Sequence, residues 1–199
     1  MQEAGIADNT IVLFFSDNGG LLDVTSNFPF RDGKGSLYEG GTREPLFIKW
    51  PGTTEGGRIC HEPVIGHDLY PTILKMAGIN KKVDVDGIDI TPLLINPEGK
   101  IKRKELHWLS FPISGHHFAN PNRKPGGAIV MDEWKLIELM ETPQGLKHHF
   151  ELYNLKEDPG ENINIYSDNP EIAKILQDKM MQWRKSVNAP EYSPSMYTK

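Results

Sequence analysis

The first strong pattern along the chain is an unbroken run of apolar and β-branched residues at positions 10–15, TIVLFF. The run lacks alternation of apolar and polar positions, which is typical of a strand buried on both faces inside a parallel, helix-covered sheet. A second strand is predicted at residues 45–50, PLFIKW, where Pro51 and Gly52 end it. The pattern therefore indicates an α/β fold whose first part contains a buried parallel sheet.

Residues 67–77 carry apolar side chains at helical spacing. The spaced positions are Leu69, Ile73, Leu74 and Ala77, and Gly78 is a stop signal. Asp68 lies near the start of this predicted helix, where the helix dipole favours a carboxylate. We therefore expect a helix here, with Asp68 as its N-terminal carboxylate.

The clearest helix is predicted near the end of the chain, with Asn169 as its cap, Pro170 at its first position and Glu171 in its first turn. Its apolar stripe consists of Ile172, Ile175, Leu176, Met180, Trp183 and Val187. Four strand-like runs precede it, at residues 105–109, 128–131, 135–140 and 150–153. Short strands separated by turns favour an antiparallel sheet, and we expect the helix to pack on that sheet.

Composition narrows the classes of protein that remain. The 199 residues carry a net charge of -5, and the densest basic patch spans only residues 100–104, which argues against a nucleic-acid partner. No apolar segment reaches the ~18 residues of a membrane span, and residues 1–10 lack the basic start and apolar core of a signal peptide. Cys60 is the only cysteine, so the sequence allows no internal disulfide.

Asp17 and Asn18 follow the first predicted strand directly, in the sequence SDNGG. Ligands of α/β enzymes gather beyond the carboxyl ends of strands, and carboxylate and amide oxygens suit a hard cation such as calcium or magnesium. The alternative is a simple turn, because Asp-Asn-Gly-Gly is also turn chemistry. Calcium takes about six to eight oxygen ligands, so two side chains form only part of a site.

Residues 31–45, RDGKGSLYEGGTREP, place Lys34 between two glycines of a long loop. The P-loop pattern fails because Gly35 follows the lysine, and the dinucleotide fingerprint fails because Tyr38 occupies its third glycine position. A lysine near a bound cation can clamp a tetrahedral oxyanion and neutralise charge during sulfuryl or phosphoryl transfer. The alternative is an ordinary solvated lysine.

These two stretches and the segments that follow resemble the type I sulfatases, the arylsulfatase group of the alkaline-phosphatase superfamily. In chain order the segments are SDNGG, GKGSLYEGGTREPLFIKWPG, GHDLYPTILKMAG, DGIDITPLL, AIVMDEWKLIEL and ELYNLKEDPGENINI. The resemblance is to the C-terminal portion of the family, particularly bacterial enzymes that act on sulfated carbohydrates. It implies that residues 1–103 form the C-terminal part of the parallel-sheet catalytic α/β domain. Residues 104–199 would then form a small subdomain with an antiparallel sheet and a helix.

The resemblance also implies roles for individual residues. Asp17 and Asn18 would be calcium ligands, and Lys34 would contact the sulfate group as a catalytic and substrate-binding residue. Arg43 would hold its loop through a structural ion pair.

The adjacent histidines His116 and His117 fall where related enzymes present substrate-recognition residues. An adjacent histidine pair also suits zinc binding or a merely polar surface, and the sequence leaves these alternatives open.

The resemblance implies a calcium-dependent sulfuric ester hydrolase for sulfated carbohydrates or aryl sulfates, in a periplasmic or secreted location. The family's formylglycine nucleophile is made from the first residue of a C/S-x-P/A-x-R motif, which neither Cys60 nor any serine of this chain opens. We therefore expect a fragment that is inactive alone and that self-associates or pairs with a missing N-terminal part. The alternatives are a noncatalytic glycan-binding or partner-completing module and a phosphatase-type member of the superfamily.

Overall fold

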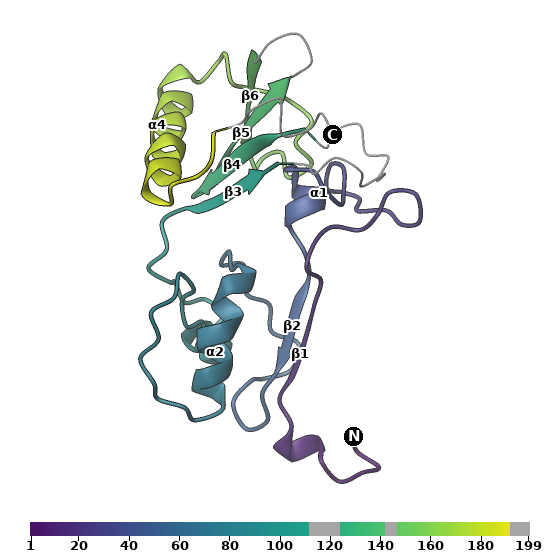
Figure 1. The fold of residues 1–199 in the computed structure, drawn as a ribbon. Helices are drawn as coiled ribbons and strands as arrows, with labels where there is room; N and C mark the ends of the chain where they lie inside the picture. The colour runs from purple at the N-terminus through teal and green to yellow at the C-terminus, as the bar shows by residue number, and fades with distance from the viewer. Residues whose placement is uncertain (112–123, 142–146, 192–199) are drawn as a thin grey trace, which may run out of the picture. The chain divides into compact units, whose positions relative to one another are not determined.

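The computed structural model describes residues 1–111, 124–141 and 147–191 (Figure 1). By their internal contacts the residues form two compact units. The first unit combines residues 1–17 with 45–103, and the second unit combines residues 18–44 with 104–199. The segment 18–44 thus groups with the C-terminal residues, while the division into a catalytic domain and a subdomain at residue 103 stays a prediction.

The first unit contains both strands that the apolar runs predict. Its elements are η1 (Ala7–Asn9), β1 (Val12–Phe15), β2 (Leu46–Lys49), η2 (Gly66–Asp68), α2 (Leu69–Met76) and α3 (Thr91–Ile95). The strands pair with each other in antiparallel direction, with Val12 opposite Lys49. The expected burial of both faces of residues 10–15 is wrong within the described chain, because Phe14 is 65% exposed and Phe15 is also exposed. A two-stranded sheet offers too little cover to bury both faces of either strand.

The predicted helix at residues 67–77 is confirmed as α2, and Gly78 follows it at a positive φ of 74°. Asp68 lies at the N-terminus of α2 as expected, and its buried carboxylate also accepts hydrogen bonds from the backbone amides of Ile65 (2.9 Å) and Ile88 (2.8 Å). Both its oxygens also pair with the guanidinium of Arg103. Burial alone would raise the pKa of Asp68, but Arg103 and the two amides hold it below its usual value. Asp68 therefore joins three segments of the first unit.

The second unit is built on a four-stranded antiparallel sheet, as the sequence predicts, and its strands lie in the order β3-β4-β5-β6. The strands are β3 (Leu106–Ser110), β4 (Gly126–Met131), β5 (Trp134–Glu141) and β6 (Lys147–Asn154). In the register of the central strands, Ile129 lies opposite Leu136 and Leu136 lies opposite Leu152. These three buried side chains share one face of the sheet.

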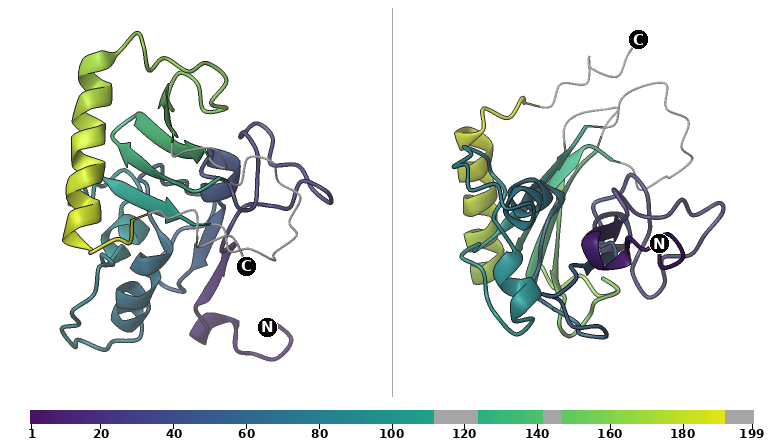
Figure 2. Two further views of the ribbon diagram at one scale, coloured as in Figure 1. Left: turned by 45° about the horizontal axis from the view of Figure 1, so that its top comes forward. Right: turned by 90° about the horizontal axis from the view of Figure 1, so that it is seen from below.

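The predicted C-terminal helix is confirmed as α4 (Pro170–Ser186), which packs on that face (Figure 2). Ala173, Leu176 and Met180 form its buried stripe against the sheet. Two positions of the predicted stripe are wrong, since Ile175 is 45% exposed and Val187 is also exposed. In the described residues, no helix is long and apolar enough to span a membrane.

The opposite face of the sheet carries the segment 18–44, which includes the short helix α1 (Glu39–Thr42). Leu37 and Tyr38 pack there against Ala128, Ile137 and Tyr153. In the right-hand view of Figure 2, α4 and α1 lie on opposite sides of the sheet. The second unit therefore has three layers, and its middle layer supports the glycine-rich segment.

The adjacent residues Leu176 and Ile175 give a matched test of this packing. Leu176 is fully buried, so we expect Leu176→Ala to lower the free energy of unfolding by about 2–5 kcal/mol through cavity formation. Ile175→Ala removes a side chain that is only about half buried and is expected to cost under about 1 kcal/mol. Urea unfolding followed by circular dichroism measures the free energy of unfolding of both variants. Equal losses of stability would contradict the packing of α4 on the sheet.

Candidate functional site

The loop that bears Lys34 is hydrogen-bonded to the segment that begins at Asn18. The backbone amide of Lys34 donates to the carbonyl of Gly20 (3.1 Å), and the amide of Gly19 donates to the carbonyl of Gly41 (3.3 Å). The side-chain amide of Asn27 donates to the same Gly20 carbonyl (2.9 Å). The backbone of Lys34 is therefore held next to residues 18–20 of the SDNGG sequence.

Close backbone packing explains why glycines occur in this segment. A Cβ atom at Gly40 would collide with the carbonyl oxygens of Arg31 and Asp32, and one at Gly19 would collide with the carbonyl of Gly40. Neither glycine has a positive φ, so the requirement is for space and not for an unusual backbone conformation. The segment folds as one tightly packed body around α1.

A buried ion cluster fixes the start of α1. The ammonium of Lys135, on β5, lies 2.9 Å from Glu39 Oε1 and 3.0 Å from Glu161 Oε1. The second carboxylate oxygen of Glu161 accepts a 2.6 Å hydrogen bond from the backbone amide of Glu39. Lys135 and Glu161 are 0% exposed, so the cluster holds one cation and two carboxylates out of water.

A second polar group lies beside this cluster. The Glu151 carboxylate accepts hydrogen bonds from the hydroxyls of Tyr38 (2.8 Å) and Tyr153 (2.7 Å). Burial, together with hydrogen bonding to Glu151, raises the pKa of both tyrosines. The Arg31 guanidinium lies 3.9 Å from the centroid of the Tyr38 ring and donates to the Tyr153 hydroxyl (2.9 Å) and the Glu161 carbonyl (3.0 Å). The segment 18–44 is thus joined to the sheet by several buried polar contacts.

The ion pair predicted for Arg43 is present. Its guanidinium lies 3.5 Å from Glu39 Oε2 and 4.8 Å from the centroid of the Phe30 ring. Since the Arg43 side chain is half exposed, this pair is weaker than the buried one that Glu39 forms with Lys135.

The predicted metal ligands fit a hard cation in chemistry but not in number. Asp17 is exposed and Asn18 is half-buried, and together they offer a carboxylate and an amide carbonyl. Across residues 1–111, 124–141 and 147–191, no group of three or more His, Cys, Asp or Glu residues could hold a metal ion. Asp17 and Asn18 therefore provide two oxygen donors of the calcium type, and the calcium site stays a prediction.

The two predicted recognition residues, His116 and His117, lie outside the described residues. Their roles in substrate recognition stay predictions.

Sequence reasoning missed the residues that hold the segment, chiefly Lys135, Glu151 and Glu161. One local signal was available for Lys135. It lies two and four residues before Ile137 and Leu139 on a predicted strand, so it shares their inward face. Nothing local marks Glu161, whose partner Glu39 is 122 residues away in sequence.

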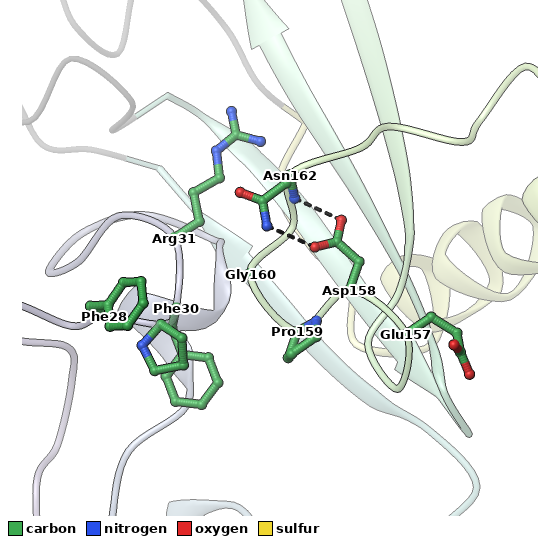
Figure 3. A pocket seen from close by; sticks show the side chains of 9 residues that line it. Phe28, Phe30, Arg31, Glu157, Asp158, Pro159, Gly160 and Asn162 are labelled. Carbon is green, nitrogen blue, oxygen red and sulfur yellow. Dashed lines mark hydrogen bonds between the residues drawn. The ribbon is translucent and has the colours of Figure 1, made fainter.

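A surface pocket of about 540 Å³ opens between residues 28–31 and 157–162 of the second unit (Figure 3). The Asp158 carboxylate shapes one wall by accepting hydrogen bonds from the backbone amide (2.7 Å) and side-chain amide (2.8 Å) of Asn162. Neither Lys34 nor Asn18 lines the pocket, which is therefore separate from the predicted site.

The fold and the Lys34 segment agree with one class of protein, the sulfatases. The family described as "N-sulphoglucosamine sulphohydrolase, C-terminal" matches residues 30–186, well over half of the chain. The chain therefore belongs to this family, and the resemblance to the C-terminal portion of a sulfatase is confirmed.

Curated relatives extend this match to the ends of the chain. A protein named "Sulfatase" from Formosa agariphila is 33% identical over 206 residues, covering 94% of this chain and 35% of the relative. Arylsulfatase K from Danio rerio is 32% identical over 197 residues, covering 99% of this chain and 35% of the relative. The chain thus spans about a third of the length of these relatives.

Solved structures give the same result for the fold. The crystal structure of Ps i-CgsB is 29% identical, with a TM-score of 0.74, and the match covers 92% of this chain and 38% of that one. The structure of BT4656 in complex with D-glucosamine-2-N,6-O-disulfate is 26% identical, with a TM-score of 0.72, and covers 95% and 37%. The fold is therefore that of the C-terminal part of a sulfatase.

The buried carboxyl of Glu161 predicts a specific pH dependence. Burial raises its pKa to about 7, against the opposing effects of Lys135 and the Glu39 amide. The folded state then binds more protons than the unfolded state between about pH 5 and pH 7, so this group makes the free energy of unfolding fall by about 2 kcal/mol as pH rises through that range.

We expect Glu161→Gln to remove this part of the pH dependence. Urea unfolding midpoints at pH 5, 6 and 7 measure it, with Glu157→Gln as a control at an exposed position nearby. The control is expected to follow the wild type. A Glu161-dependent gain in stability from pH 5 to pH 7 would show the opposite sign and contradict the assignment.

Proposed function

We propose that this chain is the part of a sulfuric ester hydrolase that presents a lysine and two calcium ligands to a sulfate ester. Membership of the sulfatase family supports the proposal and favours it over the phosphatase-type alternative. Because the chain covers about a third of its relatives, the activity belongs to the longer protein.

The observation that carries the proposal is the hydrogen bond from the Lys34 amide to the Gly20 carbonyl. It keeps the lysine beside the segment that carries Asn18. A lysine ammonium is a compact cation with three donors, and a sulfate group offers oxygens that accept from it. In this position Lys34 binds the sulfate group and neutralises the negative charge that develops during its transfer.

The proposed substrates are sulfated carbohydrates. BT4656 is described in complex with its substrate D-glucosamine-2-N,6-O-disulfate, and a Mus musculus relative that is 39% identical over 102 residues is named N-acetylgalactosamine-6-sulfatase. These names support a sulfated sugar as the substrate, but they do not identify the sugar or the position of its sulfate. His116 and His117 are proposed to contact the sugar.

Asp17 and Asn18 are proposed to hold calcium, which supplies a fixed positive charge to the sulfate when bound. The remaining ligands, like the formylglycine nucleophile, are expected from other parts of the longer enzyme, because no C/S-x-P/A-x-R motif occurs in these 199 residues. The chain alone is therefore proposed to be inactive, to pair with the remainder of the protein, and to act in a periplasmic or secreted location.

The role of Lys34 is tested by titrating the 199-residue chain with N-acetylglucosamine 6-sulfate and following backbone amide shifts by NMR. We expect a dissociation constant of about 1 mM, typical of a site with few contacts. Lys34→Met is expected to weaken binding roughly tenfold or more, because a hydrogen bond from a charged donor is worth about 1.5–3 kcal/mol.

Lys174→Met is the matched control, since Lys174 is exposed and pairs with Asp178 on α4. Unsulfated N-acetylglucosamine tests whether the sulfate group is recognised. Equal affinities of wild type and Lys34→Met for the sulfated sugar would contradict the proposal.

Calcium is tested in the same samples by adding calcium chloride and recording the amides of residues 16–20. We expect weak binding that Asp17→Ala abolishes and that Asp23→Ala, at an exposed position in the following loop, leaves unchanged. The isolated chain is expected not to hydrolyse 4-nitrophenyl sulfate, either with calcium or with EDTA. Calcium-dependent turnover that Asp17→Ala removes would disprove the predicted inactivity of the isolated chain.

A further inference from the structure

The proposed chemistry does not use the three charged groups that lie beneath α1. Lys135 and Glu161 are fully buried and Glu39 is nearly so, which means that none of them can touch a substrate. Burying charged groups costs free energy unless they are closely paired. The position of this cluster beneath α1 suggests a structural role for it.

The cluster connects to Lys34 through a short series of backbone contacts. Glu161 accepts the amide of Glu39, the first residue of α1. In the next residue of the helix, the amide of Gly40 donates to the Arg31 carbonyl (2.9 Å), three residues before Lys34.

The far end of α1 reaches Lys34 from the other direction. The Gly41 carbonyl accepts the Gly19 amide, and the next carbonyl, of Gly20, accepts the amide of Lys34. One route from the cluster thus ends at the Lys34 amide, and the other ends at Arg31, three residues before it.

We propose that Lys135, with Glu39 and Glu161, is a positioning residue that fixes the backbone presenting Lys34. The relevance of this role to catalysis rests on the proposed function, but the positioning itself is a property of the second unit. Lys135 joins the carboxylate of α1 to the carboxylate of the loop after β6, and its ammonium also lies 3.5 Å from Thr42 Oγ1.

The charge count explains why an apolar side chain cannot replace Lys135. Without its ammonium, the carboxylates of Glu39 and Glu161 face each other in a buried site, and only the half-exposed Arg43 remains paired with Glu39. The Arg31 side chain contacts Glu161 at its backbone carbonyl (3.0 Å). Where both carboxyls are ionised, their repulsion then separates α1 from the sheet. Where Glu161 is protonated, the loss of the Lys135 bridge is what loosens the Lys34 loop.

The test is native-state amide hydrogen exchange in the 199-residue chain. Lys135→Met is expected to speed exchange of the Lys34, Gly19 and Gly40 amides roughly tenfold or more, relative to amides in the centre of β4 and β5. Glu161→Gln, which leaves one cation with one carboxylate, is expected to have a smaller effect. The double variant Lys135→Met/Glu161→Gln is expected to exchange more slowly than Lys135→Met, because one of the two opposed charges is gone.

Lys179→Met is the matched control, since Lys179 pairs with Glu105 (2.7 Å) elsewhere in the second unit. It is expected to leave the Lys34 amide unchanged. Gly40→Ala provides a second route to the same result, because its Cβ separates α1 from Arg31 and Asp32 without altering any charge. It is expected to speed exchange at Lys34 even if Lys135→Met does not fold.

The positioning role is overturned if Lys135→Met leaves exchange at Lys34 unchanged, or speeds it only as much as in β4 and β5. It is likewise overturned if Gly40→Ala leaves Lys34 protected. If the loop opens as expected while N-acetylglucosamine 6-sulfate does not bind the wild type, the proposed function fails and the positioning role stands.

Discussion

The second unit depends on one buried interaction, in which the ammonium of Lys135 lies between the carboxylates of Glu39 and Glu161. These residues come from three parts of the sequence: the glycine-rich segment, the third strand of the sheet and the loop that follows β6. Because the three groups are out of water, any displacement of one leaves charge unpaired in a low-dielectric site. The interaction therefore favours one arrangement of the segment on the sheet and penalises others.

The two faces of the sheet contribute in different ways. On one face, α4 buries Leu176 and Met180 against apolar side chains, a contact that stabilises without demanding a single geometry. On the other face, Tyr38, Glu151 and Tyr153 form directional hydrogen bonds beside the Lys135 cluster. The apolar face supplies stability, and the polar face fixes the placement of residues 18–44.

Periodicity was sufficient to predict the strands of the second unit, α2 and α4, because each has a local repeat of apolar positions. It failed for Ile175, which the stripe pattern includes but the sheet does not reach. The sequence placed Lys34 in a glycine-rich loop, and the hydrogen bond that joins this loop to Gly20 became visible only in the structure. The pairing of Asp68 with Arg103 and the role of Glu161 could not be predicted, since these partners lie far apart in sequence and only the folded chain brings them together.

Electrostatic stabilisation of a transferring group requires charges that are in place before the reaction begins. A lysine side chain is long and has many rotamers, and a glycine-flanked position adds backbone freedom to that disadvantage. The hydrogen bonds of the Lys34 and Gly40 backbone amides restrict the backbone of this loop. In our proposal, the buried cluster keeps α1 where those bonds can form. In the proposed function, the backbone of Lys34 is then already in place when a sulfate group binds, which lowers the entropic cost of binding. In that proposal, Lys135 never touches the substrate but determines how effectively Lys34 can bind it.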